Sequence, residues 1–196
     1  MTGKYAAPSE PAGVAHSCNS SRTQPEPAKK SDRKFKGMTS LTPARPGEIA
    51  IDLPQSFDAD IYFIGRIRTP WKELRDCPRN SQRSGEAVAH IELDPVFALG
   101  LLDIELCSHL TVLYWLHLSR RDLIQQKPSH VTSPRGVFAL RSPVRPNPIG
   151  LSVVELVKAE GARLTIRHID CVDGTPVIDI KPYFASTDSF PDAKRP

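Results

Sequence analysis

Three prolines stand within six residues of the run RSPVRPNPIG, residues 141–150 of the chain. Each proline removes a backbone N–H donor and fixes its φ angle at about −65°. Each also pushes the residue before it, here Ser142, Arg145 and Asn147, toward an extended conformation. Such a segment is neither a helix nor a central strand, so the run predicts a stiff, extended loop.

The polar side chains of this loop indicate a binding site. Arg141, Arg145 and Asn147 are carried by a backbone with little conformational freedom left to lose, and such preorganisation favours binding. A guanidinium binds a carboxylate or a phosphate through two parallel hydrogen bonds, and an asparagine amide both donates and accepts. Gly150 then lets the chain enter a strand. The alternative is a rigid surface connector whose arginines are solvated.

A second group of polar residues lies near the C-terminal end of the chain. Asp170 and Asp173 are two carboxylates beside a tight turn at Asp173-Gly174, and a strand with alternating polarity follows. The pair could orient an amine or a hydroxyl group. On spacing alone, ordinary turn chemistry is the favoured interpretation, because Asp-Gly is a common hairpin signal.

The pattern of apolar residues predicts a mostly-β fold. Strand character recurs at intervals of about 10 to 20 residues, which gives about six strands. Seven segments are candidates: residues 60–68, 86–93, 110–118 (an apolar stretch whose strand ends at His117), 135–140, 151–157, 164–169 and 177–180. Asp94 as N-cap and Pro95 at the first helical position predict one short helix over 96–102. This pattern favours a barrel or sandwich over a doubly wound α/β sheet.

The chain is expected to have one folded domain between two tails. Residues 1–48 are rich in Pro, Ser, Lys and Ala and predict a disordered basic tail. Residues 1–55 hold eight of the 26 Lys and Arg and five of the 22 Asp and Glu, a net +3, which leaves +1 for residues 56–196. The folded domain is expected over 49–190, followed by a tail at 191–196. An alternative translation start at Met38 would remove most of the N-terminal tail.

The remaining composition argues against several classes of protein. The four cysteines, Cys18, Cys77, Cys107 and Cys171, form no CxxC pair and have no histidine at zinc spacing. We expect reduced thiols and no metal. The chain contains no run of about 20 apolar residues that could span a membrane. Its N-terminus lacks a secretory signal. A cytoplasmic protein is expected.

Two long motifs together resemble one known family. The run GVFALRSPVRPNPIGLS (136–152) is followed by DGTPVIDIKPY (173–183), and IGRIRTPWK (64–72) stands near the start of the domain. The combination resembles the TrmO or TsaA-like family of S-adenosylmethionine-dependent tRNA methyltransferases. The likeness covers about residues 60 to 184, and two ordered motifs are far more specific than one short pattern.

This resemblance implies a fold, a cofactor and a reaction. The fold would be a compact single-domain β-barrel with one or two short helices, usually a homodimer. It would bind S-adenosyl-L-methionine and methylate N6 of threonylcarbamoyladenosine beside the anticodon of tRNA. No GxGxxG motif follows a strand, so a Rossmann-type methyltransferase is not expected.

The resemblance also implies site residues, position by position. Cofactor contacts would come from Arg79, Asn80, Ser81, His117, Leu118, Arg141, Leu151, Asp173, Gly174, Thr175 and Pro176. Asp173 is the candidate base or orienter, and Tyr183 and Asn147 would position the modified base. Arg145, Asn147 and Lys181 are candidate substrate contacts, with Arg145 facing the threonyl carboxylate. Asn80 stands where the family commonly has glutamine, and His117 could instead be a packed strand-end histidine.

Three functional hypotheses follow from these patterns. The first is the tRNA methyltransferase. The second is an S-adenosylmethionine-binding sensor or interaction module, or a methyltransferase that acts on another substrate. The third is a plain nucleic-acid-binding barrel, which an aromatic fraction of 7% supports poorly.

Overall fold

The computed structural model describes residues 43–54, 56, 58–128 and 132–194. Most of the predicted basic tail, with Met38, and the last two residues lie outside the described residues. Residues 43–48 form a turn in which Arg45 and Glu48 make an ion pair of 2.6 Å. Cys77, Cys107 and Cys171 are free thiols. None of the helices in the described ranges is long and apolar enough to cross a membrane.

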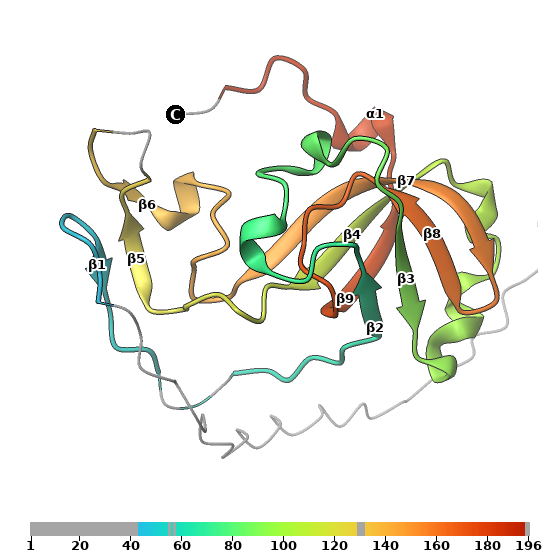
Figure 1. Cartoon of the computed structure of the whole chain (residues 1–196), viewed down its shortest axis with the longest axis horizontal. Helices are drawn as coiled ribbons and strands as arrows, with labels where there is room; N and C mark the ends of the chain where they lie inside the picture. Colours follow the sequence, from blue (N-terminus) through green and yellow to red (C-terminus); the bar gives the residue numbers. More distant parts are fainter. Residues whose placement is uncertain (1–42, 55, 57, 129–131, 195–196) are drawn as a thin grey trace, which may run out of the picture.

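Six antiparallel strands close into a barrel, which confirms the predicted mostly-β barrel class (Figure 1). In order around the barrel they are β2 (Gly65–Arg68), β3 (Ala89–Leu93), β8 (Arg163–Arg167), β7 (Ile149–Glu160), β4 (His109–Trp115) and β9 (Thr175–Pro182). The strand β9 pairs with both β2 and β4 and so closes the wall.

A smaller sheet stands beside the barrel. It contains β1 (Ile49–Ala50), β5 (Leu123–Gln126) and β6 (Arg135–Gly136), with β5 in the middle. In Figure 1 it lies to the left of the barrel; β5 and β6 belong to the connection between β4 and β7, and β1 precedes β2. The sequence patterns did not predict β1 or β5.

The described helices are all short. They are the 3-10 helices η1 (Leu74–Asp76), η2 (Ser81–Ser84), η3 (Pro95–Leu101), η4 (Ile104–Leu106) and η5 (Val137–Ala139), and the α-helix α1 (Ala185–Asp188). The helix predicted over 96–102 is therefore a 3-10 helix. Asp94 precedes it as expected, but its side chain makes no capping bond. Its carbonyl instead accepts a hydrogen bond from Phe97.

Several predicted strands have different bounds. The strand expected at 60–68 begins only at Gly65, because 61–63 is an apolar run whose side chains remain exposed rather than alternating across a wall. The strand expected at 86–93 begins at Ala89. The segment 135–140 is not a full strand, because after two residues of β6 the N–H of Leu140 bonds to the carbonyl of Val137 and tightens the chain into η5.

The Asp173-Gly174 turn is present, but it is not a hairpin. Gly174 has a φ of +79°, which a glycine adopts without steric cost. The strands on either side, β8 and β9, are not paired: β8 lies between β3 and β7, and β9 lies between β2 and β4. The turn therefore leads the chain across the end of the barrel.

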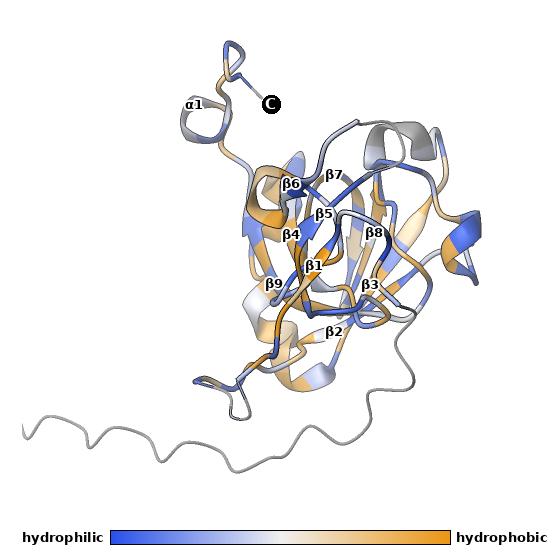
Figure 2. Cartoon of the chain, turned by 90° about the vertical axis from the view of Figure 1, so that its left-hand side faces the viewer, coloured by the Kyte–Doolittle hydropathy of each residue, from blue (hydrophilic) through white to orange (hydrophobic). Residues whose placement is uncertain are grey.

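The barrel core follows from the period of two along each strand. In β4, Leu110, Val112 and Tyr114 point inward and are buried, whereas their neighbours face outward. Figure 2 shows apolar and polar residues interspersed along the barrel strands. Complete burial of one aliphatic side chain contributes about 1.5–3 kcal/mol. The large aliphatic residues of the barrel strands that are fully buried are Ile67, Ile91, Leu110, Val112, Val154, Leu164, Ile166 and Val177.

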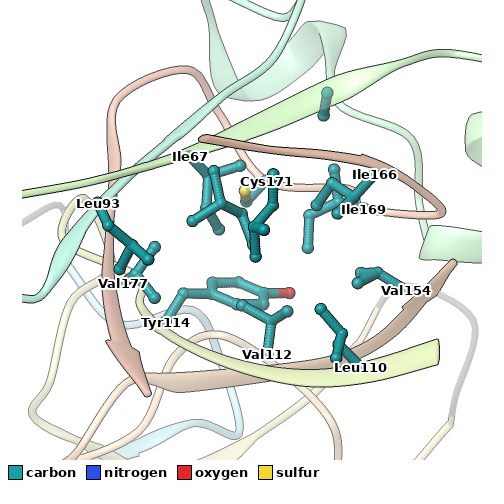
Figure 3. Close-up of a cluster of buried hydrophobic side chains, with 13 residues drawn as sticks. Ile67, Leu93, Leu110, Val112, Tyr114, Val154, Ile166, Ile169, Cys171 and Val177 are labelled. Carbon is teal, nitrogen blue, oxygen red and sulfur yellow. The ribbon is translucent and has the colours of Figure 1, made fainter. Parts of the chain in front are cut away.

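One aromatic ring fills the middle of the barrel. Figure 3 shows the ring of Tyr114 lying across the interior among Ile67, Cys171 and Val177. Tyr114 pairs across the ladder with Gly150, the last residue of the proline-rich run. A Cβ atom at Gly150 would lie 2.2 Å from Cε2 of this ring. The glycine is needed because the tyrosine ring occupies the space that a side chain would take.

We therefore expect Gly150→Ala to destabilise the fold. Overpacking of a filled core costs about 1–3 kcal/mol, and the buried ring has little room to move. The free energy of unfolding from urea denaturation measures the effect. Gly136→Ala is the matched control, because Gly136 has φ −59° and no atom within 4 Å of its added Cβ. Equal stability of the two variants would contradict the assignment.

Candidate functional site

One end of the barrel gathers three long connections. At this end, which we call the site end, β2, β4 and β8 finish and β3, β7 and β9 begin, because neighbouring strands run antiparallel. The connections are residues 69–88, 116–148 and 168–174. They and the first residues of β7 and β9 hold most of the predicted site: Arg79, Asn80, Ser81, His117, Leu118, Arg141, Arg145, Asn147, Leu151, Asp173, Gly174, Thr175 and Pro176.

Asp173 holds two of these connections together. Its Oδ1 accepts a hydrogen bond from the backbone N–H of Thr69 at 3.1 Å, and its Oδ2 accepts one from Nζ of Lys72 at 2.8 Å. Its own N–H donates to the carbonyl of Trp71 at 2.8 Å. The hydrogen bond from Lys72, with that from Thr69, lowers the pKa of the Asp173 carboxyl. Asp173 is therefore an ionised clamp, and a poor proton acceptor.

The turn after Asp173 is held by further internal bonds. The N–H of Gly174 donates to the carbonyl of Ile67 at 2.8 Å, and its carbonyl accepts from Nη1 of Arg66 at 2.9 Å. The hydroxyl of Thr175 is buried and donates to the carbonyl of Val172 at 2.7 Å. The turn is thus fixed to the end of β2.

The proline-rich loop is stiffened by one of its own arginines. The guanidinium of Arg145 donates to the carbonyls of Ser142 at 2.9 Å, Val137 at 3.2 Å and Leu140. These bonds tie the loop to η5, so Arg145 has a structural role that sequence reasoning did not foresee. Its contact with a substrate carboxylate stays a prediction.

Arg141 and Asn147 are the exposed polar residues of the same loop. Nη2 of Arg141 donates to the carbonyl of Leu151 at 2.9 Å. Oδ1 of Asn147 accepts from Nη2 of Arg121 at 3.3 Å, and Nε of Arg121 donates to the carbonyl of Pro146 at 2.6 Å. The Arg121 guanidinium also lies 5.3 Å from the ring centroid of Trp115. Arg121 therefore joins the loop to the end of β4.

His117 and Leu118 follow β4 and are both exposed. Partial burial lowers the pKa of the His117 imidazole, and the positive charge of Arg66 lowers it further. A lowered pKa makes the neutral imidazole the main form at neutral pH, and its free ring nitrogen can accept a hydrogen bond. The structure thus keeps His117 available at the site end.

Arg79, Asn80 and Ser81 lie in the connection before β3. Arg79 and Asn80 are exposed, and Ser81 is the first residue of η2. The carbonyl of Ser81 accepts a hydrogen bond from the hydroxyl of Ser84 at 2.7 Å. Just before them, the Cys77 thiol lies near Asp170, whose charge adds to the burial that raises the pKa of this thiol.

Lys181 and Tyr183 lie away from the other predicted residues. Asp173 precedes the eight-residue strand β9 and Tyr183 follows it, a separation of about 30 Å at 3.4 Å per residue. The structure therefore does not bring Tyr183 together with Asp173 as the sequence prediction assumed. Lys181 and Tyr183 instead line a groove of about 740 Å³ on the outer face, which Leu151 also lines.

A buried polar group at the site end was not foreseen. The hydroxyl of Tyr114 lies 2.9 Å from Oγ of Ser152 and donates to Oδ1 of Asp170 at 3.2 Å. Burial raises the pKa of the Asp170 carboxyl, against the lowering effects of the Tyr114 bond and the charge of Arg141. The alternation along β4 was the available signal, because it turns Tyr114 inward and a buried hydroxyl needs a partner.

The described part of the chain contains no group of three His, Cys, Asp or Glu residues that could hold a metal ion. The polar residues of the site end instead offer guanidinium donors, one neutral imidazole and one half-buried carboxylate. This set can bind an organic ligand with charges of both signs.

Comparison with known proteins gives consistent matches. Residues 66–189 match the family of the tRNA-methyltransferase O N-terminal domain. Over 141 residues the chain is 43% identical to the probable S-adenosyl-L-methionine-binding protein VirR of Rhizobium radiobacter, covering 72% of this chain and 80% of that protein. Over 140 residues it is 37% identical to the tRNA (adenine(37)-N6)-methyltransferase of Escherichia coli K12, covering 66% and 60%.

A solved structure matches as well. TrmO from Pseudomonas aeruginosa superposes with a TM-score of 0.58 and 37% identity, covering 70% of this chain and 61% of that chain. The chain thus spans less than two thirds of the E. coli and P. aeruginosa proteins. The matched residues 66–189 include all three connections of the site end.

We expect Asp173→Asn to destabilise the protein at neutral pH by about 1 kcal/mol, because a charge-assisted hydrogen bond to Lys72 is weakened. The pKa of Asp173 is lowered in the folded state. Its stabilisation is therefore present above the unfolded pKa of about 3.9 and is lost as the pH falls through the folded pKa.

Urea denaturation of wild type and variant across this acid range measures the difference. Asp179→Asn is the matched control, because the ion pair of Asp179 with Lys181 is exposed. A wild-type advantage that is independent of pH would show that the carboxylate charge is not the cause.

Proposed function

Because the chain belongs to the family of the tRNA-methyltransferase O N-terminal domain, we propose that it methylates N6 of threonylcarbamoyladenosine beside the anticodon of tRNA. The methyl donor is S-adenosyl-L-methionine. The observation that carries this proposal is the convergence of three connections at the site end, all within the matched residues. A relative from E. coli is named a tRNA (adenine(37)-N6)-methyltransferase, which supports the choice of substrate.

The side chains of the site end fit the methyl donor. S-adenosyl-L-methionine carries a carboxylate, two positive centres and an adenosine group, and when bound it supplies an electrophilic methyl group. Arg141 exposes a guanidinium that suits the carboxylate. Leu118 and Leu151 are 56% and 46% exposed and offer apolar surface to the adenosine.

The roles proposed for the other residues follow from their surroundings. The backbone groups of 173–176 are held in place by Asp173 itself, so this turn presents a fixed edge to the ligand. Neutral His117 is a hydrogen-bond acceptor for the ligand. Arg79, Asn80 and Ser81 complete the contacts from the neighbouring connection. These side chains bind and orient, and alignment of this kind is a large part of catalysis.

The substrate is large enough to reach beyond the site end. Asn147 is exposed on the proline-rich loop and is proposed to contact the modified base. Lys181 and Tyr183 line the outer groove, where they would contact another part of the same tRNA. Arg145 is proposed to contact the threonyl carboxylate through those guanidinium N–H groups that do not already donate to the carbonyls around it.

We also propose that the chain forms a homodimer and acts in the cytoplasm. The support for the dimer is the exposed apolar side chains of η3 and η4, where Leu99 and Leu106 are 92% and 81% exposed. Apolar surfaces of this kind mark interaction sites in many proteins. The cytoplasmic location rests on tRNA as the substrate.

A second candidate function is binding of S-adenosyl-L-methionine without methyl transfer. The names of two relatives favour it: VirR is named a probable S-adenosyl-L-methionine-binding protein, and a protein of Archaeoglobus fulgidus, 46% identical over 125 residues, covering 64% of this chain and 89% of that protein, is named an S-adenosyl-L-methionine-binding protein. Methylation of another substrate is the remaining alternative.

We expect Arg141→Ala to raise the Kd for S-adenosyl-L-methionine at least about tenfold, because a charge-assisted bond contributes about 1.5–3 kcal/mol and each 1.4 kcal/mol is a factor of ten. Isothermal titration calorimetry measures the constant. Arg163→Ala is the matched control, because Arg163 is exposed at the opposite end of the barrel. Equal loss of binding in both variants would contradict the placement.

We expect the purified chain to convert threonylcarbamoyladenosine in tRNA to its N6-methyl derivative when S-adenosyl-L-methionine is added. Mass spectrometry of the digested nucleosides measures the product. Transfer RNA that lacks the threonylcarbamoyl group is the control and should gain no methyl group. A thermal shift with S-adenosyl-L-methionine, about 2.7 kcal/mol at 100 times Kd, without any methylated nucleoside would favour the binding function instead.

A further inference from the structure

We propose that Asp170 is the group that accepts the N6 proton during methyl transfer, and that Tyr114 positions it. This inference rests on the proposed function. Asp170 lies shortly before the turn at Asp173. Its carboxylate accepts a hydrogen bond from Tyr114 in the barrel core. The turn and the proline-rich loop, which the sequence presents as separate motifs, meet at this tyrosine.

The position of Tyr114 is fixed from two sides. Its ring is 4% exposed and lies over Gly150, whose missing Cβ leaves the necessary space. Its hydroxyl contacts Oγ of Ser152 at 2.9 Å and Oδ1 of Asp170 at 3.2 Å. A phenol has one proton to donate. Because the carboxylate can only accept, the Ser152 hydroxyl donates to the Tyr114 hydroxyl, which donates to Asp170.

Asp170 is placed where a ligand of the site end would meet it. Its carboxylate interacts with the charge of Arg141 from the proline-rich loop. It also faces the Cys77 thiol from the connection that carries Arg79 to Ser81. Its second oxygen, Oδ2, accepts no side-chain hydrogen bond from the described residues. Tyr114 therefore holds the carboxylate through Oδ1, and the backbone N–H of Asp170 also donates to this carboxylate.

The neighbouring carboxylate is unsuited to this role. Both oxygens of Asp173 already accept hydrogen bonds, from Thr69 and from Lys72. Protonation of Asp173 would break the clamp that fixes the turn. Asp170 can take a proton on Oδ2 without losing its bond from Tyr114.

The proton transfer balances with the methyl transfer. As the bond between N6 and the methyl carbon forms, the electron pair of the S–CH₃ bond returns to sulfur, and the N6 proton moves to the Asp170 carboxylate. The products are a neutral thioether, N6-methylated substrate and a protonated Asp170, which returns its proton to water. No oxidant, reductant or further reactant is needed.

The surroundings of Asp170 support its use as a base. Burial raises its pKa, which increases the proton affinity of the carboxylate. The titratable and charged groups that face it are Tyr114, Arg141, Cys77 and Cys171. Burial raises the pKa of Tyr114 as well as of both thiols, Cys171 to about 12, so these three stay neutral at neutral pH. Arg141 is the cation among them.

The first test compares Asp170→Asn with Glu160→Gln, using the full chain and tRNA that carries threonylcarbamoyladenosine; Glu160 is exposed at the opposite end of the barrel. We expect Asp170→Asn to lower kcat at least about 100-fold, as removal of a general base does, with the Kd for S-adenosyl-L-methionine within about threefold of wild type. Glu160→Gln should keep kcat within about fivefold of wild type.

The second test uses Tyr114→Phe, which keeps the ring and removes the hydroxyl. The hydrogen bond from Tyr114 lowers the pKa of Asp170, so its loss should raise that pKa. A base acts only when deprotonated, so the acid limb of the profile of kcat against pH should move to higher pH in Tyr114→Phe. A merely structural role would reduce kcat by the same factor at every pH.

A third readout needs no turnover. Carboxyl carbon resonances of ¹³C-labelled aspartate in the full chain, without ligand, report each titration. We expect one resonance that titrates above the ordinary aspartate range, is absent in Asp170→Asn and moves to higher pH in Tyr114→Phe. If Asp170→Asn does not fold, the Tyr114→Phe shift decides the question.

The outcomes separate the two proposals. If wild type binds S-adenosyl-L-methionine but forms no methylated nucleoside, the proposed function is wrong and the role of Asp170 falls with it. If wild type forms the product, the role of Asp170 is overturned by any of three results. These are kcat above one third of wild type in Asp170→Asn, an equal loss in Glu160→Gln, or an unmoved acid limb in Tyr114→Phe.

Discussion

The burial of Tyr114 is the constraint on which the site end depends. Its ring occupies the barrel interior and requires Gly150 on the neighbouring strand. Its hydroxyl, which cannot remain unpaired in an apolar core, is satisfied by Ser152 and Asp170. The packing and hydrogen bonding of Tyr114 therefore fix two segments relative to each other. One is the start of β7, where the proline-rich loop ends, and the other is the connection that leads into β9.

Side-chain hydrogen bonds hold the connections at the site end in place. Asp173 ties the entry of β9 to the exit of β2. Arg145 ties the proline-rich loop to η5, and Arg121 ties the same loop to the end of β4. Each bond between a charge and a partly buried group is worth more than its exposed counterpart. The barrel therefore presents its connecting segments as a preorganised surface, which limits the entropy lost when a ligand binds.

Sequence reasoning predicted the features that local rules control. Period-two alternation identified β3, β8 and β9, apolar and aromatic composition identified β4, and the prolines identified the stiff loop. It failed where contacts between distant residues decide. The exposed run 61–63 has strand composition but no neighbour to pair with there, and 135–140 tightens into η5 under the bond between Leu140 and Val137. Tyr183 was grouped with Asp173 because they share one motif, but a strand is extended and separates its ends.

The conspicuous charged residues of the two motifs were predicted to act on the ligand, and the structure shows that they also hold the chain. Asp173 and Arg145 stand in the two motifs, and both are used to hold the chain. A side chain that must maintain a turn or loop cannot change its charge without releasing it, so it is poorly suited to transfer protons. Asp170 differs because one oxygen anchors it to Tyr114 and burial weakens its acidity. The proposed proton transfer is therefore assigned to Asp170, which the fold holds in position without neutralising its charge.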